Sequence, residues 1–293
     1  MSRRFQVGIR QKLFAHAEEY RSDSENGHYA SAIMQAVKDQ RSFDNFKRDY
    51  DYRKILEHVS EEQGAQYLKV LQSRNDGILE AGLNSVLLSD SVGNPIKFKY
   101  QGFNHELSPT TLRYLKVTSD LKILFGENLG NVAEIGCGYG GQALVNDQLL
   151  NVTFAHLFDL PFVNMLIDKY LNTQLLRGAY RTNVINNTLP QDYDLVISNY
   201  AFSELPKVLQ LAYIKKVISR SKHGYLTMNS GTGSSRSTGK LTLDELKDLL
   251  PEFSLIEEEP QTAAQNYIIV WGCEQECLQS NFKLHSVIYN QKN

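Results

Sequence analysis

The chain has few cysteines, no long apolar run and no excess of charge of one sign. Cys137, Cys273 and Cys277 are odd in number and form no disulfide framework, and a cysteine pair near the chain end is too small for a metal site. No stretch reaches the roughly 18 apolar residues that a membrane span needs, and the basic N-terminus lacks the apolar core of a signal peptide. These absences predict a cytoplasmic protein without a membrane span.

The charges nearly balance, with 31 basic and 33 acidic residues in a chain of 293. A general nucleic-acid-binding protein would carry a clear basic excess, so no nucleic-acid partner is expected. The length suffices for one large domain or two small ones with a substantial core.

A glycine-rich turn is the strongest motif. In NVAEIGCGYGG, residues 131–141, an apolar strand leads into Gly136, Gly138, Gly140 and Gly141. Glycines leave backbone open to a ligand and tolerate positive φ, and the N–H groups that open the next helix add partial positive charge. The motif therefore predicts a site for a nucleotide or a nucleoside-like cofactor.

Two cofactors compete for this turn. Gly136, Gly138 and Gly141 satisfy the G-x-G-x-x-G dinucleotide fingerprint, which alone is a weak signal. Glu134 favours S-adenosylmethionine (SAM), because a carboxylate there can reach the amino group of the methionine part but would repel a pyrophosphate. The position of the glycine strand, behind a long helical region, also favours SAM. A tight turn without a ligand is the remaining alternative.

The pattern of apolar residues predicts a helical N-terminal region followed by alternating strands and helices. Ser60 and Gln63 form a capping box, and Ser108-Pro109 begins a helix that ends at Gly126. Strands are expected at residues 132–135, 155–158, 182–185, 194–198, 224–228, 253–257 and 267–271.

This alternation predicts an α/β fold in which helices cover both faces of a mostly parallel sheet. The last two strands follow each other without a helix and should form an antiparallel hairpin. The expected fold is thus a Rossmann-like SAM-dependent methyltransferase sheet with an antiparallel last strand and a helical N-terminal region. We expect residues 1–107 to form a region for acceptor binding, a lid or a homodimer contact, 108–272 to bind SAM, and 273–293 to form a tail.

A family resemblance rests on segments spread over residues 43–272. They are YRKILEHVS from Tyr52, SPTTLRYLKVTSDL from Ser108, EIGCGYGG from Glu134, FDLP from Phe158, YDLVISNYAFSEL from Tyr193, GYLTMN from Gly224 and NYIIVWG from Asn266. In these segments the chain resembles the sugar O-methyltransferase family of bacterial surface-polysaccharide and natural-product gene clusters. The resemblance implies SAM as donor and a sugar hydroxyl as acceptor, but no established catalytic residue. A small-molecule O-methyltransferase with a non-sugar acceptor and a non-catalytic SAM-binding protein are the alternatives.

The expected cofactor site lies beyond the carboxyl ends of the strands, where doubly wound folds bind ligands. Asp159 ends the second strand and should accept hydrogen bonds from ribose hydroxyls, unless it serves only as a helix N-cap. The predicted cofactor-binding residues are Glu134, Gly136, Cys137, Gly138, Gly140, Asp159, Leu160, Asn199 and Tyr114.

The segment SNYAFSEL, residues 198–205, should face the methyl group and the acceptor. It lacks the prolines of base-modifying amino-methyltransferases, which favours an oxygen acceptor. Glu204 and His105 are candidate general bases, and Tyr200 should orient the acceptor. The predicted substrate-binding residues are Arg113, Tyr200, Ser203 and Glu259. A Mg²⁺ ion is compatible with these carboxylates but is not favoured.

Two further features bear on the acceptor. Lys97, Lys99, Arg113 and Lys116 form either a solvated face or a site for a nucleotide-sugar diphosphate or an acidic glycan. The polar loop 230–240 fails the spacing of a phosphate-binding loop and is expected to be a flexible connection that could cover the acceptor site.

Overall fold

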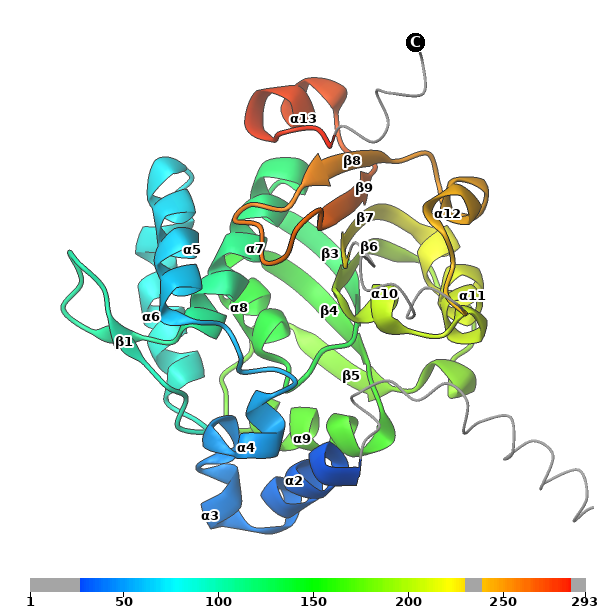
Figure 1. The fold of residues 1–293 in the computed structure, drawn as a ribbon. Helices are drawn as coiled ribbons and strands as arrows, with labels where there is room; N and C mark the ends of the chain where they lie inside the picture. Colours follow the sequence, from blue (N-terminus) through cyan, green and yellow to red (C-terminus); the bar gives the residue numbers. More distant parts are fainter. Residues whose placement is uncertain (1–26, 230–238, 286–293) are drawn as a thin grey trace, which may run out of the picture.

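A seven-stranded sheet forms the centre of the computed structural model, which describes residues 27–229 and 239–285 (Figure 1). In spatial order its strands are β5 (Ala179–Asn183), β4 (Asn151–Phe158), β3 (Asn128–Ile135), β6 (Tyr193–Asn199), β7 (Ser221–Met228), β9 (Tyr267–Trp271) and β8 (Ser254–Glu257). The strands from β5 to β7 are parallel, and β9 runs antiparallel to both of its neighbours. The expected mostly parallel sheet with an antiparallel closing hairpin is confirmed. The insertion of β9 between β7 and β8 was not predicted.

Side chains from the two faces of the sheet belong to two separate apolar cores. Leu195 and Ile197 on β6 enter one core, whereas Val196 between them enters the other. This alternation follows from the pleat of a strand, which points successive side chains to opposite faces. Both faces of the central strands are covered, which explains why these strands read as continuous apolar runs in the sequence.

Helices cover both faces, as the alternating pattern predicted (Figure 1). Side chains of the helices that connect the early strands belong to the first core, and side chains of those that follow β6 and β7 belong to the second. The first group is α7 (Pro109–Phe125), α8 (Gly141–Leu149) and α9 (Pro161–Leu171), and the second is α10 (Ala201–Glu204), α11 (Lys207–Lys216) and α12 (Leu243–Leu249). Two 3-10 turns, η3 (Ile185–Asn187) and η4 (Ile218–Arg220), and the C-terminal α13 (Gln275–Asn281) complete the described connections on this part of the chain. A further turn, η2 (Phe46–Arg48), lies among the N-terminal helices.

The N-terminal helices extend the first core. They are α2 (Gly27–Lys38), α3 (Gln40–Phe43), α4 (Tyr50–Arg53), α5 (Glu61–Ser73) and α6 (Ile78–Asp90), followed by a hairpin of β1 (Phe98–Lys99) and β2 (Glu106–Leu107). Helix α2 packs on α9, α5 on α7 and α6 on both α7 and α8. The helical nature of this region is confirmed from residue 27 onward. The division into domains at residue 108 stays a prediction, because buried side chains on both sides of it share one core.

Local capping signals set the start of several helices. The capping box of Ser60 and Gln63 is present at α5. Helix α7 begins after Ser108 and ends at Gly126 as predicted, but the Ser108 side chain makes no capping hydrogen bond. Instead, the buried Asp90 carboxylate accepts from the Ser108 N–H at 2.8 Å and from the Thr111 hydroxyl at 2.7 Å. Asp90 therefore fixes the first turn of α7, the helix that carries Arg113 toward the site.

Candidate active site

A cavity of about 720 Å³ lies at the carboxyl ends of β3, β4 and β6. The sheet side of its wall comes from the loops after these strands, and the opposite side comes from α2, the α4–α5 connection and α7. This volume is typical of small-molecule sites, and the edge of the sheet is where doubly wound folds bind ligands. The cavity is the candidate active site.

The glycine loop forms one wall of this cavity. Gly136, Gly138 and Gly140 have φ values of +76°, +58° and +89°, a region that residues with a Cβ avoid. A Cβ on Gly136 would come within 2.0 Å of the Cβ of Ala201. The loop thus needs glycine for its backbone shape and, at Gly136, also for the close approach of α10.

Asp159 connects the end of β4 to the glycine loop. Its carboxylate accepts the N–H of Gly138 at 3.0 Å and the N–H of Leu160 at 2.7 Å, and it lines the cavity. Burial raises its pKa to about 6, while these backbone hydrogen bonds act in the opposite direction. The N-cap of α9 is Leu160, so Asp159 is not a simple helix cap. It holds the loop and still presents its carboxylate to the cavity.

Glu134 lies beneath the loop near the end of β3. Its side chain is buried and is not part of the cavity lining. Burial, and then the nearby charge of Asp159, raises its pKa to about 8. A cation that enters the site would favour the ionised carboxylate, so the binding of a cation and the ionisation of Glu134 are coupled.

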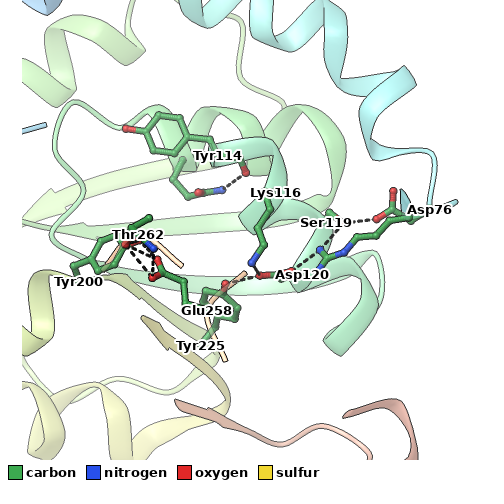
Figure 2. Close-up of polar contacts among 11 residues, drawn as sticks. Asp76, Tyr114, Lys116, Ser119, Asp120, Tyr200, Tyr225, Glu258 and Thr262 are labelled. Atoms are coloured by element: carbon green, nitrogen blue, oxygen red, sulfur yellow. Dashed lines mark hydrogen bonds and ion pairs between the residues drawn. The ribbon is translucent and has the colours of Figure 1, made fainter. Parts of the chain in front are cut away.

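Tyr200 follows β6 in a strained conformation, with φ +70° and ψ −35°. Its hydroxyl donates to the buried Glu258 carboxylate and lies 3.2 Å from the Thr262 hydroxyl, and Glu258 also accepts the Thr262 N–H at 2.9 Å (Figure 2). Backbone strain of this kind concentrates at functional sites. The Glu258–Thr262 pair therefore holds Tyr200 at the cavity wall.

The predicted substrate residue Glu259 lies elsewhere. Its side chain is exposed, whereas the neighbouring Glu258 is buried. The segment leaves β8 at Glu257, so consecutive side chains point to different sides, and the acidic run in the sequence gave no sign of which one turns inward. The carboxylate that supports the site is thus Glu258.

The candidate base His105 is also remote from the cavity. It is exposed on the β1–β2 hairpin and lines a separate cavity of about 220 Å³ with Leu83, Phe103 and Leu107. The residues of the hairpin that line this second cavity do not line the first one, which the sequence could not indicate. His105 therefore has no place in the candidate active site.

The other predicted residues fall into two groups. Those that line the cavity are Gly136, Gly138, Asp159, Leu160, Asn199, Tyr200, Glu204 and Arg113. Those that lie behind its wall are all buried: Glu134, Cys137, Gly140, Tyr114 and Ser203. Gly140 lies against Ile167 and Leu171 of α9. Ser203 bonds to the Tyr200 carbonyl and the Asn229 N–H, and Tyr114 packs on Tyr139. Burial raises the pKa of the Cys137 thiol, so this cysteine is inert packing.

Some lining residues were missed by the sequence analysis. His58, between α4 and α5, replaces His105 as the histidine at the site, and Asn229 binds Glu204 through a 2.8 Å hydrogen bond to its carboxylate. Partial burial, and then repulsion from Arg113, lowers the pKa of His58. His58 stands within the segment YRKILEHVS, but nothing in that segment alone indicated that it folds over the cavity.

The predicted basic cluster does not assemble at the site. Lys116 is buried and bonds at 2.7 Å to Asp120, which also binds Arg74 and accepts from the Tyr225 hydroxyl (Figure 2). Lys97 and Lys99 belong to the hairpin region and do not line the cavity. Of the four basic residues, Arg113 alone reaches the candidate active site.

Residues 27–229 and 239–285 contain no cluster of three His, Cys, Asp or Glu side chains suited to a metal. The helices of the same ranges include none with the length and apolarity to cross a bilayer. Most of the loop 230–240, including its predicted role as a cover, lies outside the described residues.

Comparisons with known proteins give structural likeness only. No protein-family model and no curated protein sequence matches the chain. Among solved structures it is similar to the N-methyltransferase NodS from Bradyrhizobium japonicum WM9 in complex with S-adenosyl-L-homocysteine (13% identity, TM-score 0.42, covering 55% of this chain and 85% of NodS). It is also similar to the mitomycin 7-O-methyltransferase MmcR (14% identity, TM-score 0.38, covering 85% of this chain and 69% of MmcR). A third similar structure is an rRNA methylase from Streptococcus thermophilus (14% identity, TM-score 0.41, covering 56% of this chain and 98% of the methylase). At these identities and TM-scores the likeness says nothing about the activity of this chain.

Proposed function

We propose that the protein is a SAM-dependent O-methyltransferase that methylates a sugar hydroxyl. The observation that carries the proposal is the glycine loop, held by Asp159 and opening on a cavity of about 720 Å³ with Glu134 beneath it. The fold supports a nucleoside-like donor at this edge of the sheet. The family resemblance of the sequence supports a sugar as acceptor.

The donor would lie along the carboxyl ends of β3 and β4. Asp159 would accept from the ribose hydroxyls, and the bare backbone at Gly136 and Gly138 would allow close contact. Apolar side chains at the neighbouring end of the cavity, Ile185 and Leu209, suit the face of an adenine ring. The methionine ammonium would be attracted by Glu134 from below the loop.

SAM supplies an electrophilic methyl group, and the chain's own residues supply position and a proton acceptor. Holding the acceptor oxygen in line with the methyl carbon is worth about 7–11 kcal/mol. Tyr200 would orient the acceptor, and Glu204 is the proposed base that takes the hydroxyl proton. Asn229 fixes the Glu204 carboxylate through its 2.8 Å hydrogen bond.

A non-sugar acceptor is the second candidate. Ile55, Leu56 and Val59 give the N-terminal side of the cavity an apolar wall. This wall would favour an apolar small molecule over a polar glycan.

Donor binding and product detection test the proposal together. Titration calorimetry with SAM should detect binding, and mass spectrometry after incubation with SAM and a panel of nucleotide sugars should find a product heavier by one methyl group. SAM binding without any methylated sugar would leave only the non-sugar acceptor or a non-catalytic role. Absence of SAM binding would contradict the whole proposal.

Glu134 predicts a pH dependence of donor affinity. In the free protein its pKa is about 8, so the carboxyl is mostly protonated at pH 6 and ionises as the pH rises. Because an ammonium favours the ionised form, the affinity for S-adenosylhomocysteine should rise between pH 6 and pH 8, by at most about tenfold per unit. The Glu134→Gln variant should bind more weakly at pH 8 and lose this slope.

The matched control for Glu134 is Glu127→Gln, which changes an exposed carboxylate at the other end of the strand. It should retain both the affinity and the slope, as measured by calorimetry at each pH. An unchanged slope in Glu134→Gln would show that this carboxyl does not contact the donor.

The contact of Tyr200 with Glu258 predicts an effect on turnover. Tyr200→Phe removes the hydroxyl that Glu258 and Thr262 hold, so the ring is less well positioned. We expect kcat to fall about tenfold while S-adenosylhomocysteine affinity stays within about twofold. Tyr50→Phe, at an exposed ring, is the control. Equal kcat in both variants would show that the Tyr200 hydroxyl does not help to orient the acceptor.

A further inference from the structure

Arg113 places a positive charge at the cavity wall, with its guanidinium 5.7 Å from the centre of the Tyr114 ring. Its side chain is partly buried and lines the cavity, and its Nε is buried without a hydrogen-bond partner. No ion pair joins it to an acid of the described residues. Leaving a buried cation unpaired is costly, so such a group points to an anion that arrives with a ligand.

Three other buried or part-buried cations of this core do have partners. Lys116, on the same helix, and Arg74 both bind the buried Asp120. Lys47 donates to the Ser89 carbonyl at 2.7 Å and lies 4.2 Å from the centre of the Tyr139 ring. Among the described residues, Arg53 also has a buried Nε without a hydrogen-bond partner, but of these two arginines it is Arg113 that lines the cavity.

The groups around Arg113 leave it available. Glu57 is near enough to help raise the pKa of Arg113 but forms no ion pair with it. Burial raises the pKa of Glu57 to about 7. His58, Tyr67 and Tyr200 are its other polar neighbours, and the buried Tyr67 hydroxyl also lacks a hydrogen-bond partner. The Tyr67 hydroxyl does not line the cavity, so the group that can meet an oxygen anion there is the guanidinium.

The charge of the cavity limits the size of that anion. Among the described lining residues, Arg113 is the only lysine or arginine, and Asp159 and Glu204 are acidic. A diphosphate would need more than one cation to balance it, whereas a carboxylate matches one guanidinium through two parallel hydrogen bonds. The balance favours a single carboxylate.

We propose that Arg113 is a carboxylate-binding subsite of the cavity. The inference rests on the proposed function, which offers two ligands with a carboxylate. One is the methionine part of the donor, and the other is an acidic acceptor such as a uronic acid. Both sources present the same chemistry to the guanidinium. The experiment must therefore separate them.

The test compares ligands that differ by the carboxylate. S-adenosylhomocysteine carries it and 5′-methylthioadenosine lacks it, and methyl glucuronoside carries it whereas methyl glucoside does not. Calorimetry of the full chain would measure the two nucleosides alone, and the two sugars in the presence of saturating 5′-methylthioadenosine. Arg113→Gln is the test variant, and Arg113→Lys keeps the charge but loses the two parallel N–H donors of the guanidinium. The control is Arg220→Gln, which changes an exposed arginine outside the cavity lining. Unchanged thermal unfolding would show that each variant folds.

If the donor supplies the carboxylate, Arg113→Gln should weaken S-adenosylhomocysteine binding about 10- to 100-fold and leave 5′-methylthioadenosine unchanged. If the acceptor supplies it, the same loss should appear for methyl glucuronoside alone. Either result supports the subsite, with a smaller loss in Arg113→Lys. Affinities unchanged for all four ligands, or no preference of the wild type for either carboxylate, would overturn it. Failure of the wild type to bind both nucleosides would instead count against the proposed function, and the glucuronoside comparison would still decide the subsite.

Discussion

Gly136→Ala is expected to abolish donor binding, with S-adenosylhomocysteine affinity falling at least about 100-fold. Two costs combine at this position. The backbone has φ +76°, and a Cβ would lie 2.0 Å from that of Ala201 at the start of α10. Relief of the clash must move either the glycine loop or the segment of Asn199 and Tyr200, and both line the cavity. Calorimetry measures the loss directly.

Gly77→Ala separates the steric cost from the backbone cost. Gly77 has φ +75°, but a Cβ there would meet no atom within 4 Å. This variant should lose about 1–2 kcal/mol of unfolding free energy and keep the donor affinity of the wild type. Gly136→Ala with wild-type affinity would show that the donor does not depend on the glycine loop.

Glu204→Gln is expected to lower kcat by roughly 10²- to 10⁴-fold, as for the removal of a general base. The amide has the size of the carboxylate but cannot accept the proton. Glu204 lines the cavity and contacts Asn229 rather than the glycine loop, so donor affinity should stay within about twofold. Quenched assays at saturating acceptor, followed by mass spectrometry, give kcat.

His58→Ala and His105→Ala are the comparison variants. His58 lines the same cavity, whereas His105 lies on the hairpin and should be silent. A large loss in His58→Ala with an active Glu204→Gln would transfer the role of base to His58. Its lowered pKa would then keep it neutral and active at pH values somewhat below those of an ordinary histidine. Full activity in both cavity variants would exclude each as the base.

The elements of the sheet were predictable because their signals are local. Strand β9 was expected at Tyr267–Trp271 and is found there, and the capping box at Ser60 begins the helix that it predicted. Apolar runs and caps depend on neighbours in sequence, so one chain suffices to recognise them. The order of β9 and β8 depends on packing between distant segments and was not accessible in this way.

The site was predictable only where a residue is tied to a strand end. Asp159 and Asn199 follow β4 and β6, so the topology of a parallel sheet brings them to one edge. His105 and Glu259 were chosen by residue type within loops, and both lie away from the cavity. His58 and Glu258 were missed because their orientation is set by the packing of the N-terminal helices and of the turn after β8. Charge in a loop does not reveal which way a side chain points.

A crystal structure with S-adenosylhomocysteine tests the central claim most directly. The account predicts the nucleoside along Gly136 and Gly138, with its ribose hydroxyls at Asp159 and its amino group toward Glu134. The ligand at another place in the fold, or a nicotinamide dinucleotide bound along this loop in its stead, would contradict it.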